Sequence, residues 1–492
     1  MTSNADHEVT YGRDNFVAQH GLWTHDKLDK AEEVREKLKE HKIRFVRVVF
    51  ADVHGIARGK TITVENFLTT LRNGLNVTVA LLAMDSGNII MKPLFSEDGG
   101  FGIKEMGGAG DLILVPDPGT FHVLPWAPGT AWVLGDLYLT TGAPVPHDGR
   151  GIYQRALRTL HARDLEYVVG LEVEFYIMKL TDPKLQFADS GQPPAPPDVE
   201  ALTHGYQYQS DNRMDEAAVI VEVLSDNVLE LGLPLRSVEE EWGPGQIEFT
   251  FDIGTDLAPA DMMVLFRGAA KQICRRHGYL ASFMCKPGLP NAYSSGWHLH
   301  ESLRSVKTKK NIFPAENDNE LVSSDARFFV GGLIEQAGPG FAFANPTINA
   351  YKRINANPLA PQRAVWSHDN KGAFVRVVGG GTQPLTHIEN RSGEPAANPY
   401  LFMASQLIAG IDGMERKIDP GEPRTDPYVQ MDRPALPTTL SEAVDALENS
   451  SVFRESMGDV FIDYFISVKR HEISRFNAYV TDWEHREYFE SF

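Results

Sequence analysis

Four short segments of the sequence place polar, charged or imidazole side chains two residues apart. The first, GLEVEFYIM at 170–178, holds Glu172 and Glu174 between apolar residues. Residues i and i+2 of a β-strand share a face, so both carboxylates stand together opposite an apolar face. At this spacing they repel each other by about 2–3 kcal/mol at an effective dielectric constant of about 20. The pattern predicts either a strand with one solvated face or a strand that faces bound cations.

Three further segments repeat this alternation. They align Glu248 with Gln246 and Thr250 in GQIEFTF, His298 with His300 in GWHLHES, and Glu389 with His387 and Arg391 in THIENRS. A fifth segment, VEEEWGPGQ, places three consecutive glutamates before a Pro-Gly turn: Glu239, Glu240 and Glu241. One such strand is ordinary, whereas four favour faces that meet at a single site.

Such a site would gather about five carboxylates and two imidazoles, whose pKa values would have to rise without counter-charge. Oxygen donors with an occasional imidazole suit Mg²⁺ or Mn²⁺, and no cysteine lies near enough in sequence to favour Zn²⁺. Basic residues follow, namely Lys352, Arg353, Lys371, Arg376 and Arg391. Arginines beside such ligands fit phosphoryl transfer, although most arginines are surface residues. The residues alone leave a two-metal amidohydrolase open as the alternative, which a test of ATP dependence would separate.

The elements that position these residues favour an α+β protein of two domains. A chain of 492 residues exceeds one ordinary core. Residues 27–41 have helical apolar spacing, and short β-rich runs follow up to residue 139. The segment 140–151, TTGAPVPHDGRG, is interpreted as a linker. We therefore expect a small β-rich domain at 1–145 and a large catalytic domain at 146–492.

Composition narrows the range of partners and compartments. The formal charge of −19 argues against nucleic acid and anionic membranes. No apolar run approaches the roughly 20 residues of a membrane span, and the polar start does not suggest a targeting signal. Cys274 and Cys285 are the two cysteines, without CxxC spacing. We expect a cytoplasmic protein with small-molecule substrates.

In their order along the chain, these segments resemble the glutamine synthetase family. The pieces that carry the resemblance are GLEVEFYIM, GPGQIEF, KPGLPNAYSSGWHLHESL, NPTINAYKR, IENRSGEPAANPYL and LPTTLSEAVDALENS. The resemblance implies an N-terminal β-grasp domain and a catalytic domain on a curved antiparallel sheet. It also implies ATP, two or three Mg²⁺ or Mn²⁺ ions, and a homo-oligomer. The expected assembly is a dodecamer of two stacked hexamers, with active sites between subunits.

The resemblance also assigns roles to individual residues. One metal would be held by Glu174, Glu241 and Glu248, with Glu240 as the alternative to Glu241, and the second by Glu172, His298 and Glu389. The nucleotide would contact His300, Ser302, Arg376, Lys371 and His387, while Arg353, Arg391, Ser294 and Gly296 would bind glutamate. Arg353 and Arg376 would also take part in catalysis. Asp52, lent by a neighbouring subunit, would take a proton from the amine, in a pocket completed by Tyr206, Leu359 and Tyr293.

One departure from the family pattern bears on the substrate. Leu359 stands where glutamine synthetases carry a flap glutamate that attracts ammonium, and Tyr293 begins a loop that has Asn and Gly in the family. An apolar side chain favours an amine with a hydrocarbon body, since each buried CH₂ contributes about 0.8 kcal/mol. We therefore expect a ligase that joins glutamate to an alkyl or aromatic amine through γ-glutamyl phosphate. An ordinary glutamine synthetase and a catalytically silent relative remain alternatives.

Overall fold

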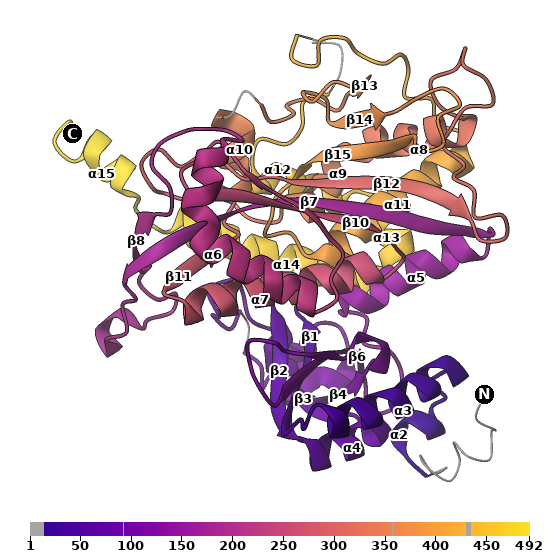
Figure 1. Cartoon of the computed structure of the whole chain (residues 1–492), viewed down its shortest axis with the longest axis vertical. Helices are drawn as coiled ribbons and strands as arrows, with labels where there is room; N and C mark the ends of the chain where they lie inside the picture. The colour runs from indigo at the N-terminus through magenta and orange to yellow at the C-terminus, as the bar shows by residue number, and fades with distance from the viewer. Residues whose placement is uncertain (1–13, 92, 357–358, 430–433) are drawn as a thin grey trace.

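The computed structural model describes residues 14–91, 93–356, 359–429 and 434–492. The N-terminal part holds a six-stranded sheet in the order β2-β1-β6-β4-β3, with β5 paired to β6. Figure 1 shows this part below the larger C-terminal part, with α2, α3 and α4 beside its sheet. Its strands are β1 (Phe45–Ala51), β2 (Ala57–Thr63), β3 (Leu75–Thr78), β4 (Asp111–Pro116), β5 (His122–Val123) and β6 (Thr130–Tyr138), and its helices are α2 (Phe16–Gln19), α3 (His25–Glu40) and α4 (Val64–Asn73).

The C-terminal part holds a nine-stranded sheet in the order β13-β14-β15-β12-β7-β10-β9, with β8 and β11 also paired to β7. Among these pairings only β13 with β14 is parallel, and the sheet is curved. The strands are β7 (Leu165–Asp182), β8 (Asp198–Ala201), β9 (Leu235–Glu240), β10 (Gln246–Thr255), β11 (Tyr279–Ser282), β12 (Trp297–Ser305), β13 (Trp366–His368), β14 (Val375–Val378) and β15 (His387–Gly393).

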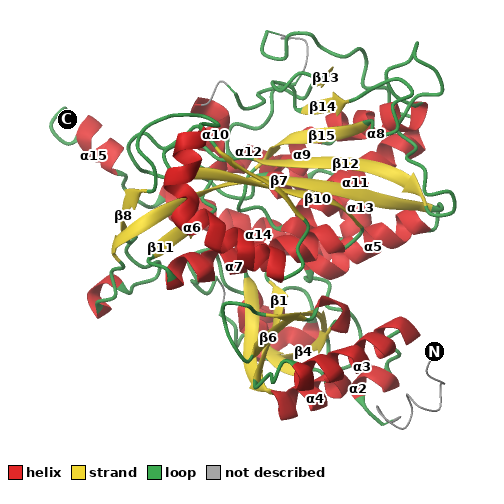
Figure 2. Cartoon of the chain, viewed as in Figure 1, coloured by secondary structure: helices red, strands yellow, loops and turns green. Residues whose placement is uncertain are grey.

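Helices pack along the long strands, as the colouring by secondary structure in Figure 2 makes visible. They are α5 (Gly149–His161), α6 (Asp211–Glu230), α7 (Ala258–Arg276), α8 (Ser324–Glu335), α9 (Ala337–Ala344), α10 (Ala350–Ala356), α11 (Pro399–Arg416), α12 (Leu440–Glu448), α13 (Ser451–Met457), α14 (Asp459–Asn477) and α15 (Asp482–Tyr488). The predicted α+β class is confirmed. No helix in the described ranges combines the length and apolar composition needed to cross a membrane.

The apolar face of β7 is the one that its alternation predicts. Val173, Phe175 and Ile177 are fully buried, and the Phe175 ring stacks on Phe283 at a centroid distance of 4.7 Å. Phe266 of α7 contacts the same ring edge-on at 5.7 Å. Removing an aromatic side chain from such a core costs about 3–5 kcal/mol. This packing holds the opposite, acidic face of the strand in a fixed position.

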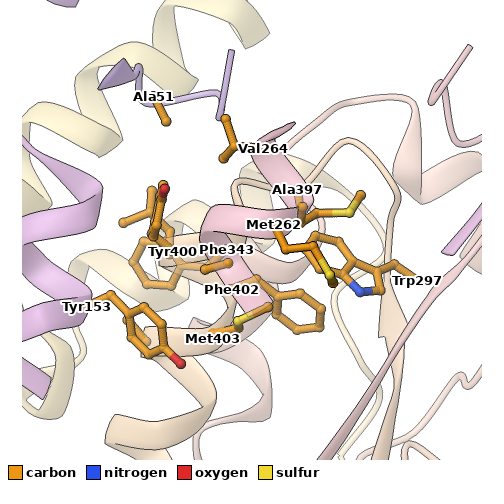
Figure 3. Close-up of a cluster of buried hydrophobic side chains, with 14 of the residues drawn as sticks. Ala51, Tyr153, Met262, Val264, Trp297, Phe343, Ala397, Tyr400, Phe402 and Met403 are labelled. Carbon is orange, nitrogen blue, oxygen red and sulfur yellow. The ribbon is translucent and has the colours of Figure 1, made fainter. Parts of the chain in front are cut away.

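One continuous apolar core joins the two parts of the chain. Figure 3 shows Ala51, at the end of β1, near Val264 of α7 and Tyr400 of α11. The segment 140–151, whose glycines and prolines predict a linker, runs into α5 at Gly149. Arg150 is buried and pairs with Asp136 at 2.6 Å, Asp261 at 2.8 Å and Asp117 at 3.0 Å. These ion pairs bind residues of the first part, the linker segment and α7 into one unit.

Candidate active site

Strand register brings the four acidic segments side by side. In the antiparallel pairing of β10 with β7, Glu248 lies directly opposite Glu174. Directly opposite residues have Cβ atoms about 4.5–5.5 Å apart, close enough for their carboxylates to interact. β12 places His298 opposite Glu172, and β15 places Glu389 opposite His300. The expected convergence of these faces is therefore present in one chain.

Histidines from β12 surround the Glu172 carboxylate. His298 Nδ1 lies 3.2 Å from Glu172 Oε2, and His300 Nε2 lies 3.0 Å from Glu172 Oε1. Burial opposes ionisation of Glu172, but hydrogen bonds from both histidines outweigh it and hold its pKa well below the ordinary value. His300 Nδ1 in turn lies 3.0 Å from His387 Nε2. Glu172 is thus the carboxylate that keeps its negative charge at the middle of the site.

Glu241 and Glu248 have the opposite character. Burial, followed by the charge of Glu174, raises the pKa of both carboxyl groups well above the ordinary value of 4.5. Glu241 is the member of the glutamate run that lies beside Glu174. Glu240 points elsewhere, since its Oε1 accepts a hydrogen bond from Thr203 at 3.0 Å. The charge of Glu174 acts on Glu241, and Glu240 bonds to Thr203, so the assignment of Glu241 as a metal ligand stays a prediction.

The donor set fits divalent cations. Ligand atoms of Glu172, Glu248 and His298 lie within 4.8 Å of one another, as do those of Glu172, His300 and Glu389. Crowding raises the pKa values of these carboxyl groups, so a bound cation would stabilise their charged forms. Oxygen donors combined with imidazole suit Mg²⁺ or Mn²⁺. These two groups share Glu172 and differ from the two predicted triads, in which Glu172 belonged to one metal alone. Both arrangements draw on the same face of the sheet.

Two arginines flank the carboxylate of Glu389. Arg376 donates to Glu389 Oε2 at 3.1 Å, and Arg391 donates to Oε1. Burial opposes ionisation of Glu389, but the charge of Arg391 dominates and lowers its pKa. Arg376 also pairs with Asp369. Positive charge from both arginines therefore lies beside Glu389, and their expected roles, Arg376 at phosphate and Arg391 at glutamate, stay predictions.

Arg353 reaches the site from α10 through a gap that a glycine leaves open. Its guanidinium donates to the backbone oxygens of Ser392 at 3.1 Å and Arg391 at 3.1 Å. A Cβ at Gly296 would lie 2.7 Å from an Arg353 nitrogen, so any larger residue would displace the arginine. The Gly296 amide also donates to Glu174 Oε2 at 2.9 Å.

Lys371, Ser302 and Ser294 contact or neighbour residues of this centre, whereas the place of Leu359 at it stays a prediction. The charge of Lys371 acts on Glu241, and Ser302 is buried one alternation beyond His300 on the same face of β12. Gln246 donates to the backbone oxygen of Ser294 at 3.3 Å. Leu359 is 54% exposed, in the loop between α10 and β13. The two residues before it, 357 and 358, lie outside the described residues.

Asp52 is bound within its own hairpin. Its Oδ1 accepts from the amides of His54 and Ile56 at 3.0 and 2.9 Å, and its Oδ2 accepts from Arg58 Nε at 2.8 Å. Asn398 fixes the hairpin to α11 by donating to the Asp52 backbone oxygen at 2.9 Å. Its expected role at a neighbouring subunit's site stays a prediction.

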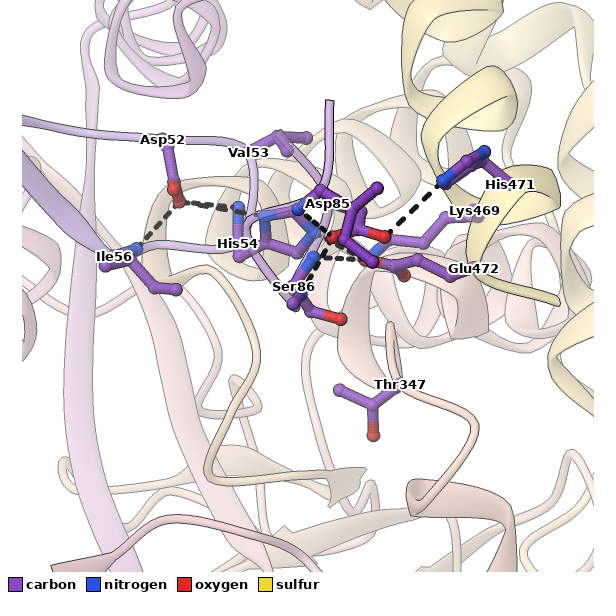
Figure 4. Close-up of polar contacts among 12 residues, drawn as sticks. Asp52, Val53, His54, Ile56, Asp85, Ser86, Thr347, Lys469, His471 and Glu472 are labelled. Carbon is purple, nitrogen blue, oxygen red and sulfur yellow. Dashed lines mark hydrogen bonds and ion pairs between the residues drawn. The ribbon is translucent and has the colours of Figure 1, made fainter. Parts of the chain in front are cut away.

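The last long helix supports the same hairpin. Glu472 of α14 lies 2.7 Å from His54 Nε2 and accepts from Ser86 N at 3.0 Å and from Lys469 at 2.9 Å, as Figure 4 shows. Burial opposes ionisation of Glu472, yet the charge of Lys469 and the contact with His54 lower its pKa well below the ordinary value. This buried network joins the first part of the chain to its end.

Sequence reasoning missed Gln246 as a site residue, although its place on the Glu248 face was visible. The Gln246 side chain donates to Glu174 Oε2 at 3.1 Å and to Ser295 Oγ at 3.0 Å, and accepts from the Gly243 amide at 2.9 Å. It thus ties the loop after Glu241 to Glu174. Only knowledge of the turn at 242–245 would have identified this role.

Sequence reasoning also missed Tyr208 and Trp242, two of four aromatic residues that lie together beside the carboxylates. We call Tyr206, Tyr208, Trp242 and Tyr293 the aromatic wall. The Tyr208 and Trp242 rings stack at 4.7 Å with 3° between their planes. Burial, then the charges of Glu241 and Glu248, raises the pKa of Tyr208 to about 12. The wall therefore adjoins the carboxylate cluster.

The metal-free protein is expected to lose stability as pH rises above about 4.5. Glu241 and Glu248 have raised pKa values in the folded state, so the native state binds more protons than the unfolded state, and stability falls with pH. Thermal melting between pH 5 and 8 with EDTA should show this decline, and Mn²⁺ should flatten it while releasing protons. In the Glu248→Gln variant, the difference in thermal stability between the Mn²⁺ and EDTA samples should be smaller. An unchanged difference would contradict the assignment of Glu248 to the metal site.

Models of known families match nearly the whole chain. Residues 146–488 match the glutamine synthetase catalytic domain, and residues 30–145 match the glutamine synthetase N-terminal domain. Gamma-glutamylanilide synthase of an Acinetobacter species is 40% identical, over 96% of this chain and 98% of that protein. Glutamate–methylamine ligase of Methyloversatilis universalis is 28% identical, over 94% and 99%.

Solved structures agree with these sequence comparisons. A structure titled as a GmaS/ADP complex superposes with a TM-score of 0.78 at 27% identity, covering 92% of this chain and 99% of that one. The GmaS structure without ligand gives 0.77 at the same identity and covers 92% and 98%. The predicted resemblance to the family is confirmed.

Proposed function

Because the chain belongs to the glutamine synthetase family, we propose that it is an ATP-dependent ligase joining glutamate to an organic amine. The observation that carries the proposal is the register of β10, β7, β12 and β15, which gathers carboxylates and imidazoles beside paired arginines. Relatives named for an anilide and for methylamine support an amine other than ammonium.

The reaction has two steps. A γ-carboxylate oxygen of glutamate attacks the γ-phosphorus of ATP, the bond from that phosphorus to the bridging oxygen breaks, and ADP leaves. The amine nitrogen then attacks the γ-carbonyl carbon as a C–N bond forms and the bond to the phosphate oxygen breaks. One N–H proton passes to the proposed base, Asp52 of a neighbouring subunit, as phosphate leaves. The products are a γ-glutamylamide, ADP and phosphate.

Residues of the site divide between these tasks. Glu174, Glu241 and Glu248 would hold one divalent ion, and Glu172, His298 and Glu389 a second. Two or three Mg²⁺ or Mn²⁺ ions, when bound, supply positive charge that compensates the phosphate oxygens. Arg376 and Lys371 add charge around ATP, alongside His300, Ser302 and His387. Glutamate would be gripped by Arg353 and Arg391 at the loop of Ser294 and Gly296.

The site is expected to exclude the small hydrated ammonium ion. Leu359 supplies no carboxylate, and the aromatic wall presents apolar surface beside the carboxylate cluster. Asp52 of a neighbouring subunit remains the proposed base, with Tyr206 and Tyr293 at the amine.

Assembly and location form part of the proposal. We propose a homo-oligomer of two stacked hexamers with sites between subunits. In α15 and the residues after it, Trp483 and Phe489 are 60% and 76% exposed, and Figure 1 shows this helix standing away from the body. Apolar side chains in such a position support subunit contacts. Cys274 and Cys285 are buried and unpaired, which supports a reducing cytoplasm.

An amine panel tests the function directly. ADP release from ATP and glutamate should increase at least about tenfold more with an organic amine than with ammonium at equal concentration, because a hydrocarbon body gains about 0.8 kcal/mol per buried CH₂. The γ-glutamyl product should form in a one-to-one ratio with ADP. A preference for ammonium across the panel would instead identify an ordinary glutamine synthetase.

A further inference from the structure

The aromatic wall is an exposed apolar surface next to a charged site. Its four side chains are between 37% and 46% exposed. Trp242 and Tyr293 are close to parallel, with 27° between their planes at 6.4 Å, and Tyr206 meets Tyr293 edge-on at 5.2 Å. Large aromatic side chains left exposed together mark a binding surface more often than a chance grouping.

The wall is held in place by bonds that need no ligand. Tyr176 Oη accepts from the Tyr293 amide at 2.7 Å and lies 3.1 Å from the Tyr293 backbone oxygen. Tyr206 Oη donates to the Asn291 backbone oxygen at 2.9 Å. The loop of Tyr208 is fixed by Gln209, whose amide and side chain bond to β9 at 3.1 and 2.8 Å. A surface prepared in this way loses little conformational entropy on binding.

The wall also lies at the reacting end of the site. Trp242 directly follows Glu241, and the Gln246 side chain bonds both the Gly243 amide and Glu174. A substrate ring stacked on Trp242 would therefore place its substituent near the carboxylate cluster. Offset-stacked aromatic pairs contribute about 0.5–1.5 kcal/mol beyond their buried area.

Charge then selects among the amines that could stack there. Alkylamines are cations at neutral pH and must lose a proton before they attack. Arylamines are neutral, because the nitrogen lone pair is delocalised into the ring, and they need no base first. The expected base, Asp52, accepts from three donors in its own hairpin, one of them Arg58. Leu359 supplies no second carboxylate.

From this combination we infer that the amine substrate is a primary arylamine, bound as its neutral form with its ring stacked on the face of Trp242 opposite Tyr208, so that Tyr208 supports the Trp242 ring from behind. The inference rests on the proposed ligase function and adds two specificity-determining residues to it. Aromatic cages also attract ammonium groups, with about 0.5–2 kcal/mol per contact. A protonated nitrogen has no lone pair for attack, so the neutral amine is favoured.

Three amines of similar size distinguish the effect of an aromatic ring on activity from the effect of a positive charge. Aniline is aromatic and neutral, benzylamine is aromatic and cationic, and cyclohexylamine is neither aromatic nor neutral. We expect kcat/KM for aniline to exceed both others at least tenfold at pH 7. From pH 7 to 8, kcat/KM should stay constant with aniline and should rise with cyclohexylamine. Equal values for cyclohexylamine and aniline would overturn the inference, whereas no ADP release with any amine would overturn the ligase function itself.

Variants of the wall supply the second readout. Trp242→Ala and Tyr208→Leu should each raise the KM for aniline at least tenfold while leaving the KM for ATP and glutamate within about twofold. Trp242→Tyr should restore most of the affinity. Phe187→Ala, which removes a fully exposed ring elsewhere, is the matched control and should change nothing. An unaltered KM for aniline in Tyr208→Leu, or equal losses for all three substrates in both variants, would contradict stacking.

Discussion

Glu389→Gln is expected to lower the rate of ADP release by at least about 10²–10³-fold. The substitution keeps the volume of the side chain but removes a negative charge that two arginines share, Arg376 at 3.1 Å and Arg391. It also removes a carboxylate from one of the two groups suited to a cation. Calorimetric titration with Mn²⁺ should show weaker binding in parallel with the loss of turnover.

Glu301→Gln is the matched control for this variant. Glu301 lies on the opposite face of β12, beside Tyr167, and is fully buried. Burial raises its pKa to about 8, so it is mostly uncharged at pH 7 and an amide resembles it closely. Activity within about twofold of the unmodified protein is expected. If Glu389→Gln behaved like this control, β15 would not belong to the catalytic centre.

Arg150→Met is expected to destabilise the protein by about 3–5 kcal/mol, because it removes the buried guanidinium that three largely buried carboxylates share. Arg150 pairs with Asp117, Asp136 and Asp261, which come from separate segments. The midpoint of urea unfolding should fall accordingly, while the KM for ATP at low temperature should stay unchanged.

Arg454→Met provides the comparison, since Arg454 pairs with Asp459 and Asp463, which are largely exposed. Exposed pairs contribute about 0–1 kcal/mol, so its midpoint should move little. Equal shifts in both variants would show that Arg150 adds no more than a surface pair.

Alternation with period two was sufficient to predict the faces of the site strands. Glu172 and Glu174 share the acidic face of β7, as expected, because side-chain direction in a strand is a local property. Register is not local. That Glu248 lies opposite Glu174 depends on a pairing between segments more than 70 residues apart, which no single segment encodes.

The ion pairs of Arg150 and the ring contacts of the aromatic wall depend on contacts between distant segments, which composition does not indicate. Gly and Pro predict a linker at 140–151, but that composition does not indicate that Arg150 pairs with three aspartates from other segments. Tyr208 and Trp242 lie in different loops on either side of α6 and β9, and their rings come into contact only in the folded chain. The ring contacts and the role of Gln246 follow from turns whose geometry the sequence does not specify.

The bond between His54 and Glu472 spans 418 positions of the chain. During synthesis the β1–β2 hairpin emerges well before α14. The hairpin that carries Asp52 therefore lacks the contact between His54 and Glu472 until α14 has been synthesised. Contacts of such long sequence separation slow folding and expose intermediates to aggregation. Ending the chain before Glu472, as a premature stop codon would, should thus remove the contact that holds the hairpin of Asp52 in place.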